Sequence, residues 1–178
     1  SMNDKGFTTE QQNEIRIYRA EARFLRALSY YHAMDLFGSV PFVDESTPIG
    51  VFYPQQIERA ELFDWLEDEL IAIENTLTTP SQVPYGRASQ AAAQSLLAKM
   101  YLNAEVYTGT SRWTDCITYC NKVINTGAFA LDNNYSNLFM ADNHSSSEII
   151  FPICFDGQYT QTWGGTTFLI CAALGSTM

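Results

Sequence analysis

Residues 19–43 read RAEARFLRALSYYHAMDLFGSVPFV, and this stretch decides the fold. It lies within a longer segment whose apolar residues recur every three or four positions, which predicts an amphipathic helix. The pair Thr8 and Gln11 has the pattern of a capping box and marks the start of that helix. Gly38 is a typical residue just beyond a helix end, so the helix is expected to stop at about Phe37. The apolar positions are Ile15, Tyr18, Ala22, Leu25, Leu28, Tyr31 and Ala33.

The first helix has an internal copy 71 residues later in the chain. The matched pairs are Ala20 with Ala91, Ala22 with Ala93, Leu25 with Leu96, Ala27 with Ala98, Tyr30 with Tyr101, Ala33 with Ala104, and Gly38 with Gly109. This offset is about twice the 34-residue period of tetratricopeptide repeats. One helical hairpin cannot bury its own apolar face, so neighbouring hairpins stack. The repeat therefore predicts two stacked hairpins, at residues 8–76 and 88–126.

Three further helices are expected, at residues 54–76, 89–107 and 113–125. Pro54 suits a first helical turn, and Thr110 or Ser111 is expected to cap the last of the three. The helix at 89–107 is rich in alanine, which favours a close approach to a neighbouring helix. An acidic face of the helix at 54–76 is expected to be solvated, and it carries Glu58, Glu61, Asp64, Glu67, Asp68 and Glu74.

The character of the chain changes after Gly127. Residues 135–140 are expected to form one helical turn, and residues 148–155 (EIIFPICF) a short or edge strand, because a proline interrupts this β-rich run. The apolar residues 168–173 are expected to be buried in a complete domain. The predicted fold is therefore mainly α, with tetratricopeptide-like helical hairpins at 8–126, followed by a loop-rich part at 127–178 that contains a short strand.

Composition excludes several classes of protein. The 178-residue chain is 46% hydrophobic and 17% charged, which is typical of a globular protein and not of a disordered one. No apolar run reaches the roughly 18 residues of a membrane helix. The net charge of −10 disfavours binding to nucleic acid, which requires lysine and arginine. An aromatic content of 13% is compatible with neutral, flat-faced ligands such as sugars.

The chain has no sequence motif of an enzyme. It lacks GxGxxG, Walker A, GxSxG and HExxH, and it has only two histidines, so neither catalysis nor a cofactor is expected. Cys116 and Cys120 are interpreted as small buried hydrophobic residues rather than metal ligands, and a disulfide stays open for Cys154 and Cys171. Acidic and amide residues at 132–134 and 142–143 have two interpretations, a hard-cation site or turn chemistry, and turns are favoured.

Arginines recur along the first helix, at Arg16, Arg19, Arg23 and Arg26. The favoured interpretation is a solvated face that forms ion pairs with acidic neighbours, and the alternative is a contact surface for a partner. Trp65 and Trp113 lie on predicted helices and are expected in the core.

Three blocks of sequence resemble the RagB/SusD family of nutrient-binding outer-membrane lipoproteins. The first is residues 19–43, with matches at Glu21, Ala22, Arg23, Phe24, Leu25, Arg26, Ala27, Tyr30, Phe37, Gly38, Val40 and Pro41. The second begins YGRASQAAAQSLLAKMYLNA, with matches at Gly86, Arg87, Ala92, Leu96, Leu97, Ala98, Lys99, Tyr101, Leu102 and Ala104. The third matches at Tyr135, Leu138, Phe139, Asn143, Ser146, Glu148, Ile149, Ile150 and Phe151. The three blocks occur in the family's order and cover most of the chain.

The resemblance implies a non-catalytic protein that binds oligosaccharides or polysaccharides at the surface of the outer membrane. It also implies delivery of the ligand to a TonB-dependent transporter similar to SusC, and attachment to the membrane through a lipid anchor absent from this chain. Members of the family are about three times this length, so the chain resembles a central section. Two alternatives are a tetratricopeptide-type scaffold that binds proteins without contacting glycan and, less favoured, a glycoside hydrolase.

Sugars present apolar C–H faces and polar hydroxyls, so aromatic rings beside amides and hydroxyls are suited to bind them. Trp163 is the first candidate, since it lies among Gln161, Thr162 and two glycines in a predicted loop. Burial of this tryptophan against another part of the domain is the alternative. Tyr159 and Asn143 are further candidate ligand-binding residues, and no metal site is expected.

Overall fold

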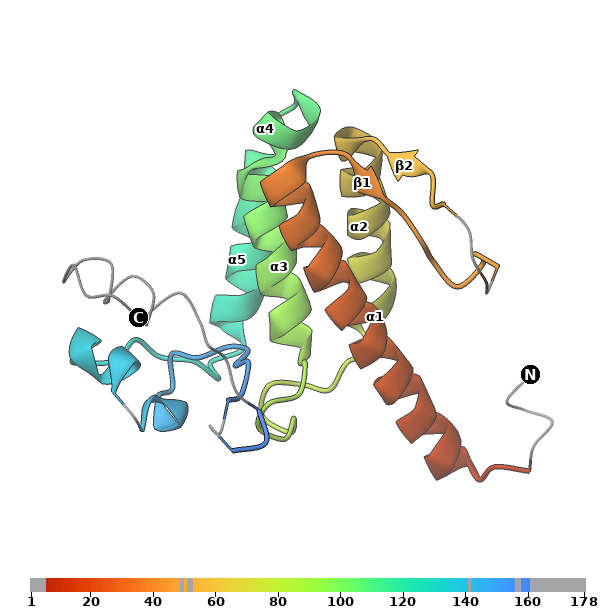
Figure 1. Ribbon diagram of the computed structural model, residues 1–178. Coiled ribbons are helices and arrows are strands. Elements are labelled where there is room, and N and C mark those ends of the chain that lie inside the picture. Colours follow the sequence, from red (N-terminus) through yellow and green to blue (C-terminus); the bar gives the residue numbers. More distant parts are fainter. Residues whose placement is uncertain (1–5, 49, 51–52, 141, 156–157, 161–178) are drawn as a thin grey trace, which may run out of the picture.

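The computed structural model describes residues 6–160 apart from 49, 51–52, 141 and 156–157. Within this part of the chain, helix α1 (Thr9–Phe37) packs against α2 (Arg59–Glu74), and α3 (Gln90–Leu102) packs against α5 (Trp113–Asn125). Helix α2 also contacts α3 and the short α4 (Ala104–Thr108), so the two hairpins stack on each other. Figure 1 shows these helices as the body of the molecule, with the N-terminal half of α1 extending beyond it. The predicted mainly α fold with helical hairpins is confirmed.

Helix α1 begins and ends where the sequence predicts. Thr8 and Gln11 form the capping box: the Thr8 hydroxyl accepts a hydrogen bond from the Gln11 amide at 3.2 Å, and the Gln11 side chain accepts one from the Thr8 amide at 3.0 Å. Gly38 closes the helix at φ 75°. The prediction of the apolar face of this helix is only partly correct, because Tyr18 and Leu25 are about half exposed. The residues that α1 buries are Ala20, Phe24, Ala27, Tyr31 and Met34.

The second helix starts later than the sequence suggests. The chain around Pro54 is not helical, and β2 (Gln56–Ile57) pairs antiparallel with β1 (Val40–Pro41), with Val40 opposite Ile57. A further hydrogen bond joins the Phe42 amide to the Gln55 carbonyl at 2.9 Å. This ladder holds the residues before α2 in an extended conformation, so the helix cannot begin before Arg59.

The predicted third helix is divided in two at Asn103. The Asn103 side chain donates to the Lys99 carbonyl at 3.2 Å, and its backbone has φ −104° and ψ 11°. An asparagine that bonds to its own helix backbone competes with helical hydrogen bonding, which accounts for the break between α3 and α4. Gly109 then ends α4 at φ 79°, so both halves of the internal repeat close on a glycine with positive φ.

Helix α5 has the predicted bounds but not the predicted cap. Its N-cap residue is Arg112, without a side-chain capping bond. The Arg112 guanidinium instead forms hydrogen bonds with Glu67 of α2 and with Asp115. Trp113 is 50% exposed, so its predicted place in the core is wrong. Trp65 packs against the core, within ring-contact distance of Tyr30 and Phe42.

Part of the acidic face of α2 lies inside the molecule, contrary to the prediction of a solvated face. Glu74 is 7% exposed and accepts hydrogen bonds from Gln94 and Lys122, each at 2.9 Å. Glu67 is half-buried and accepts a bond from the Tyr101 hydroxyl at 2.6 Å. The sequence pattern fails here because cations and hydroxyls from other helices satisfy these carboxylates, which no local spacing reveals.

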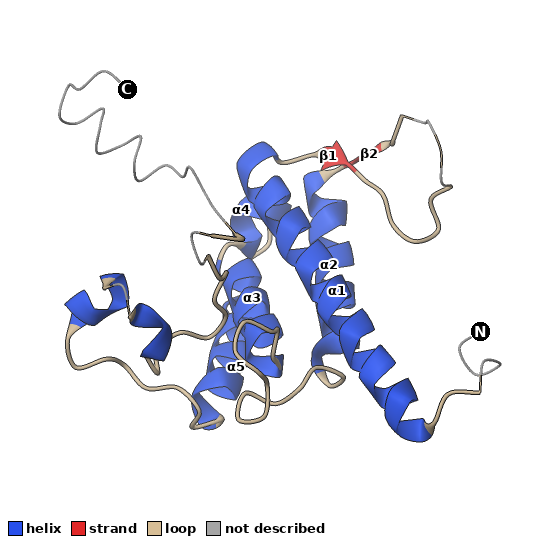
Figure 2. Cartoon of the chain, turned by 60° about the horizontal axis from the view of Figure 1, so that its bottom comes forward, coloured by secondary structure: helices blue, strands red, loops and turns tan. Residues whose placement is uncertain are grey.

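The described residues after α5 form loops and two short 3-10 helices, η2 (Tyr135–Phe139) and η3 (Asn143–Ser145), which include the predicted turn at 135–140. The predicted strand at 148–155 does not form. Phe151 instead packs edge-on against Phe24 of α1, with ring centroids 5.2 Å apart. Side-chain packing onto a helix, without a neighbouring strand to pair with, therefore fixes this segment. Figure 2 shows the loops beside one end of the helices.

The four arginines of α1 divide into two groups. Arg23 and Arg26 both bond to Glu69, and Arg26 also bonds to Glu45, as the ion-pair interpretation predicts. Arg16 and Arg19 are exposed, and within the described residues neither has an ion pair. No helix in this part of the chain is long and apolar enough to span a bilayer.

The cysteines are only partly as predicted. Cys116 is buried, whereas Cys120, one helical turn further along, is exposed, so its interpretation as a buried hydrophobic residue is wrong. Cys154 is an exposed free thiol, and Cys171 lies outside the described residues.

Candidate functional site

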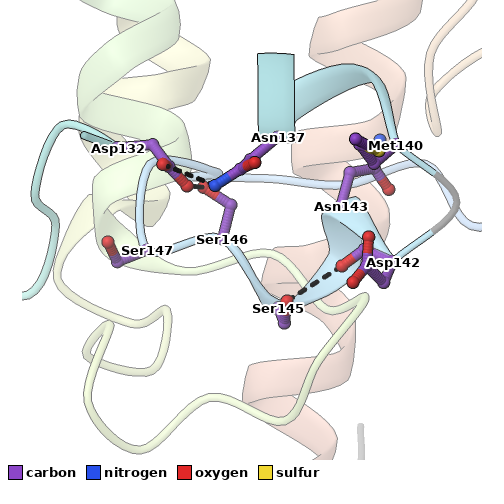
Figure 3. Close-up of a pocket in the computed structure, with 8 residues that line it drawn as sticks. All are labelled: Asp132, Asn137, Met140, Asp142, Asn143, Ser145, Ser146 and Ser147. Atoms are coloured by element: carbon purple, nitrogen blue, oxygen red, sulfur yellow. Dashed lines mark hydrogen bonds between the residues drawn. The ribbon is translucent and has the colours of Figure 1, made fainter. Parts of the chain in front are cut away.

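A polar cavity of about 340 Å³ lies among the loops that follow α5. We call it the Asn143 pocket, after the predicted ligand-binding residue that lines it. Figure 3 shows its lining, in which carboxylate, amide and hydroxyl groups predominate. The lining residues are Asp132, Asn137, Met140, Asp142, Asn143, Ser145, Ser146 and Ser147.

Asp132 holds the two walls of the Asn143 pocket together. One of its carboxylate oxygens accepts hydrogen bonds from the backbone N–H of Asn134 and from the side-chain amide of Asn137, both at 3.0 Å. The other accepts one from the Ser146 hydroxyl at 3.4 Å, and the Asp132 amide donates to Glu148 at 3.0 Å. These bonds join the wall at 130–137 to the wall at 145–148, so the pocket has a defined polar frame.

Asn143 is the first residue of η3. Its side-chain nitrogen donates to the Leu138 carbonyl at 3.0 Å, which ties η3 back to η2. The side-chain oxygen of the amide can still accept a hydrogen bond, as can the exposed carboxylate of Asp142 next to it. The pocket thus offers acceptors and hydroxyls suited to a ligand with many hydroxyl groups.

Two exposed aromatic rings stand on η2, which also supplies Asn137 to the pocket wall. Tyr135 is 74% exposed and Phe139 is 73% exposed, and their rings contact each other with centroids 5.1 Å apart. Exposed aromatic rings beside polar groups match the two sides of a sugar, one apolar and one polar. Tyr135 and Phe139 are candidate site residues that sequence reasoning missed, although the two aromatic residues lie four positions apart in a polar loop.

A second cavity, of about 500 Å³, also borders η3. Asn143 lines it as well, together with Tyr85, His144 and residues of the 149–155 segment. Tyr85 is 60% exposed, and its ring lies 6.4 Å from that of His144. Partial desolvation and the nearby Cys154 thiol raise the pKa of Tyr85. The tyrosine hydroxyl is neutral at pH 7 with or without this shift, and it can donate a hydrogen bond.

The structure says less about the other two predicted site residues, Tyr159 and Trp163. Tyr159 is 85% exposed and is absent from the described lining of both cavities that contain Asn143. Trp163 lies outside the described residues. The structure therefore locates Asn143 in a pocket and does not bring Tyr159 to that pocket.

The acidic and amide residues at 132–134 form turns, as favoured over a cation site. Asp132 accepts from the backbone amide two residues later, and Asn134 does the same with Ser136 at 3.1 Å. Among the described residues, no group of three or more histidine, cysteine, aspartate or glutamate side chains is placed to hold a metal ion.

Comparison with known sequences decides the family. The profile of the SusD-like_3 family, described as "Starch-binding associating with outer membrane", matches residues 2–102, which is more than half of the chain. The chain belongs to the SusD-like family. The matched residues include α1, α2 and α3 of this SusD-like chain.

Curated relatives extend the match into the loops. The SusD-like chain is 44% identical over 157 residues to the starch-binding protein SusD of Bacteroides thetaiotaomicron, a match that covers 86% of this chain and 28% of SusD. It is 28% identical over 136 residues to a SusD-like protein of Bacteroides ovatus, covering 72% of this chain and 24% of that protein. The chain thus spans about a quarter of the length of these relatives.

Solved structures share the fold. A SusD-like carbohydrate-binding protein from Bacteroides fragilis superposes on this SusD-like chain with a TM-score of 0.71 at 25% identity, covering 83% of this chain and 29% of that one. Surface glycan-binding protein A from Bacteroides thetaiotaomicron, solved in complex with laminarihexaose, superposes with a TM-score of 0.64 at 21% identity, covering 83% and 29%.

Proposed function

We propose that this protein binds oligosaccharides or polysaccharides without catalysis at the surface of the outer membrane. The observation that carries the proposal is the 44% identity to the starch-binding protein SusD over 157 residues. That match covers 86% of this chain, and its length exceeds that of residues 2–102, so it extends beyond the family profile. Neutral glycans also suit a chain of net charge −10, which disfavours anionic polymers.

The proposed glycan contacts are Asn143, Tyr159 and Trp163. Asn143 is supported by its place in the polar pocket, with Tyr135 and Phe139 exposed on the adjoining short helix. Tyr159 is supported by its exposed ring, and Trp163 by its sequence context of amide, hydroxyl and glycine residues. Together they would supply aromatic faces for the sugar rings and polar groups for the hydroxyls.

Calorimetric titration of the whole protein against a panel of neutral glycans tests this proposal. We expect Asn143→Ala to raise the Kd about 3- to 10-fold, because one hydrogen bond contributes about 1 kcal/mol. Trp163→Ala removes an aromatic platform and is expected to raise it about 30-fold, the effect of a hot-spot residue.

Matched controls exist for both kinds of residue. Asn133 is an exposed asparagine in the same loop region that lines neither Asn143 cavity, and Tyr53 is a 94% exposed tyrosine on the loop before α2. Asn133→Ala and Tyr53→Ala are expected to leave the Kd unchanged. Absence of binding to every glycan in the panel, with binding to peptides instead, would defeat the proposal.

We further propose that the protein delivers the bound glycan to a SusC-like TonB-dependent transporter. The exposed guanidinium groups of Arg16 and Arg19 stand on the half of α1 that extends beyond the helical body (Figure 1), which favours a contact with another protein. This surface also supports the alternative function, a tetratricopeptide-type scaffold that binds proteins without contacting glycan. Arg23 and Arg26 are unsuitable probes of such a contact, because both are committed to Glu69.

Co-purification with the transporter tests the contact. The double variant Arg16→Gln/Arg19→Gln is expected to reduce the recovered complex at least several-fold, whereas Glu10→Gln/Glu14→Gln on the same exposed part of α1 serves as the control. Equal recovery of wild type and both variants would remove this surface from the proposal. Loss of the complex with intact glycan binding would separate the two roles, and release of reducing sugar by the pure protein would contradict a non-catalytic function.

A further inference from the structure

The second cavity beside η3, of about 500 Å³, differs in chemical character from the Asn143 pocket. We call it the Tyr85 cavity. Its described lining consists of Tyr85, Asn143, His144, Ile149, Pro152, Ile153, Cys154 and Phe155. Apolar and aromatic side chains predominate in this lining, whereas carboxylate, amide and hydroxyl groups predominate in the Asn143 pocket. Each of the two cavities lies within the range of about 300 to 1,000 Å³ that is usual for complete ligand pockets.

The loop at 84–87 places Tyr85 in the wall of this cavity. Gly86 has φ 81°, a backbone conformation that favours glycine, and a Cβ on this residue would stand 3.1 Å from the Cys154 sulfur. The loop therefore lies directly against the segment that contains Cys154, and the missing side chain permits this close approach. Tyr85 precedes Gly86 in the chain, so the same approach holds its ring at the cavity while leaving 60% of the residue exposed.

Tyr85 and His144 form an aromatic pair in the lining of the Tyr85 cavity. Their ring centroids lie 6.4 Å apart and their ring planes meet at 78°, and His144 is exposed like Tyr85. This edge-on arrangement leaves at least one face of each ring uncovered by the other ring. The tyrosine hydroxyl and the imidazole nitrogens can also form hydrogen bonds. The pair therefore offers both kinds of contact that a sugar ring needs, an apolar face and polar atoms.

Asn143 lines both cavities and therefore connects them. In Figure 3 it lies on the side of the Asn143 pocket away from Asp132. Its side-chain nitrogen donates to the Leu138 carbonyl, so its side-chain oxygen is the group that can accept a hydrogen bond from a ligand. A ligand that extends from Asp132 past Asn143 reaches the Tyr85 cavity. Because each cavity alone has the size of a complete ligand pocket, a chain of linked sugars can occupy both, whereas one sugar unit occupies one of them.

We propose that the Tyr85 cavity is a second sugar subsite, in which Tyr85 and His144 contact the unit next to the one bound in the Asn143 pocket. A sugar in the Asn143 pocket is required for this arrangement, so the inference rests on the proposed function. The ligand class is narrowed to chains of at least two linked neutral sugars. The described lining of the two cavities contains no lysine or arginine, and the carboxylates of Asp132 and Asp142 disfavour an acidic sugar.

Two linked subsites make the affinity depend on the length of the chain, because binding of the first sugar unit holds the next one at a high effective concentration. Calorimetric titration of the whole protein tests this dependence. The probes are glucose chains of one, two, four and six units with α-1,4 or β-1,3 linkages, together with the same lengths of any other neutral glycan that the wild type binds. We expect the Kd of the wild type to fall at least tenfold between the shortest measurable chain and the six-unit chain.

Tyr85→Ala should raise the Kd of the six-unit chain about tenfold, the effect of losing one aromatic contact residue, and leave that of the shortest chain unchanged. Tyr85→Phe keeps the ring and should stay within about threefold of the wild type, and Tyr53→Ala should change nothing. Equal Kd values for wild type and Tyr85→Ala at every length overturn the inference and leave the proposed function standing. Equal weakening at every length also overturns it, because the substitution then acts on the whole protein. A wild type that binds no glycan defeats the proposed function and the subsite together.

The Cys154 thiol provides a second measurement, because it is exposed and lines the Tyr85 cavity. We expect the six-unit chain to slow the modification of Cys154 by maleimide at least fivefold and the shortest chain to leave it unchanged, as measured by peptide mass spectrometry. The reporter Tyr53→Cys, at a 94% exposed position outside the described lining of both cavities, should react equally with and without glycan. Equal rates at Cys154 overturn the inference. A Cys154 thiol that is unreactive before glycan is added overturns it too, since the protein itself then fills the cavity.

Discussion

Individual carboxylate side chains of α2 bind the side chains of neighbouring helices and hold these helices in place. Glu69 is 8% exposed and accepts hydrogen bonds from Arg23 at 2.8 and 2.5 Å and from Arg26. Glu67 accepts hydrogen bonds from Tyr101 of α3 and from Arg112, the N-cap residue of α5, and Glu74 accepts one from Lys122 of α5. A carboxylate that is desolvated is stable as an anion only when such donors surround it, so each of these residues fixes the position of a neighbouring helix.

Glu69→Gln is expected to lower the free energy of unfolding by about 3 kcal/mol, because it leaves two arginines without their shared carboxylate. Chemical denaturation measures the change. Glu61→Gln, on the same helix at an exposed position without an ion pair among the described residues, should change it by less than about 0.5 kcal/mol. Equal effects of the two substitutions would contradict the role assigned to Glu69.

The difference in unfolding free energy between wild type and Glu69→Gln should depend on pH. Burial alone would raise the pKa of Glu69, but the hydrogen bonds from Arg23 and Arg26 outweigh burial and lower it. A lowered pKa in the folded state contributes stability above the unfolded-state pKa of about 4.3, and this stability is lost as the pH falls through the folded-state pKa. The stability gap between wild type and Glu69→Gln should therefore be constant near pH 7 and close progressively below about pH 4. A gap that widens in acid would show that another group is responsible.

At the scale of single elements, two helices end at glycines whose backbone conformations favour this residue. Gly38 and Gly109 both close helices with positive φ, but their conformations differ. Gly109, at φ 79° and ψ 2°, is left-handed helical, which other residues adopt with a modest penalty. Gly38, at φ 75° and ψ −104°, lies where residues with a Cβ are much less tolerated, and it turns the chain from α1 into β1.

Alanine substitution should separate the two glycines. We expect Gly109→Ala to cost about 1 kcal/mol of unfolding free energy and Gly38→Ala about 2–3 kcal/mol. The added Cβ is not itself crowded, since it meets no atom within 4 Å at Gly109 and only the Arg59 side chain at 3.8 Å at Gly38. Thermal or chemical denaturation measures both changes, and Gly109→Asn should recover part of the loss because asparagine tolerates this conformation. Equal costs at the two positions would contradict the backbone explanation.

At the scale of the whole molecule, the described residues form a stack of helical hairpins with a loop region packed on one side. Phe151 against Phe24 fastens the loop region to α1, and Gly86 lies close enough to Cys154 that a Cβ there would stand 3.1 Å from its sulfur. These contacts place η3 and the Asn143 pocket beside the hairpins. The helices therefore act as the frame, and the irregular segment supplies the polar groups proposed to meet a glycan.

Most of the helical framework was predictable from the sequence, because helix periodicity and capping are local properties. The capping box at Thr8, the glycine closures and the 71-residue repeat each depend on residues a few positions apart or on direct self-similarity. The candidate site was predictable only in part. Asn143 is among the residues selected from the sequence, whereas Tyr135 and Phe139 were missed. The four-residue spacing of these two rings is visible in the sequence, but their exposure is visible only in the structure.

The sequence by itself determined the α1 start, the α5 span and the family, since side-chain spacing and motif order suffice for these. Tertiary structure alone decided that Glu67 and Glu74 turn inward and that Trp113 stays half exposed. It also decided that Phe151 packs on α1 and that residues 148–155 form no strand. The physical reason is that burial depends on partners far along the chain. Arg112 and Lys122, which satisfy these carboxylates, lie 45 and 48 residues away from them.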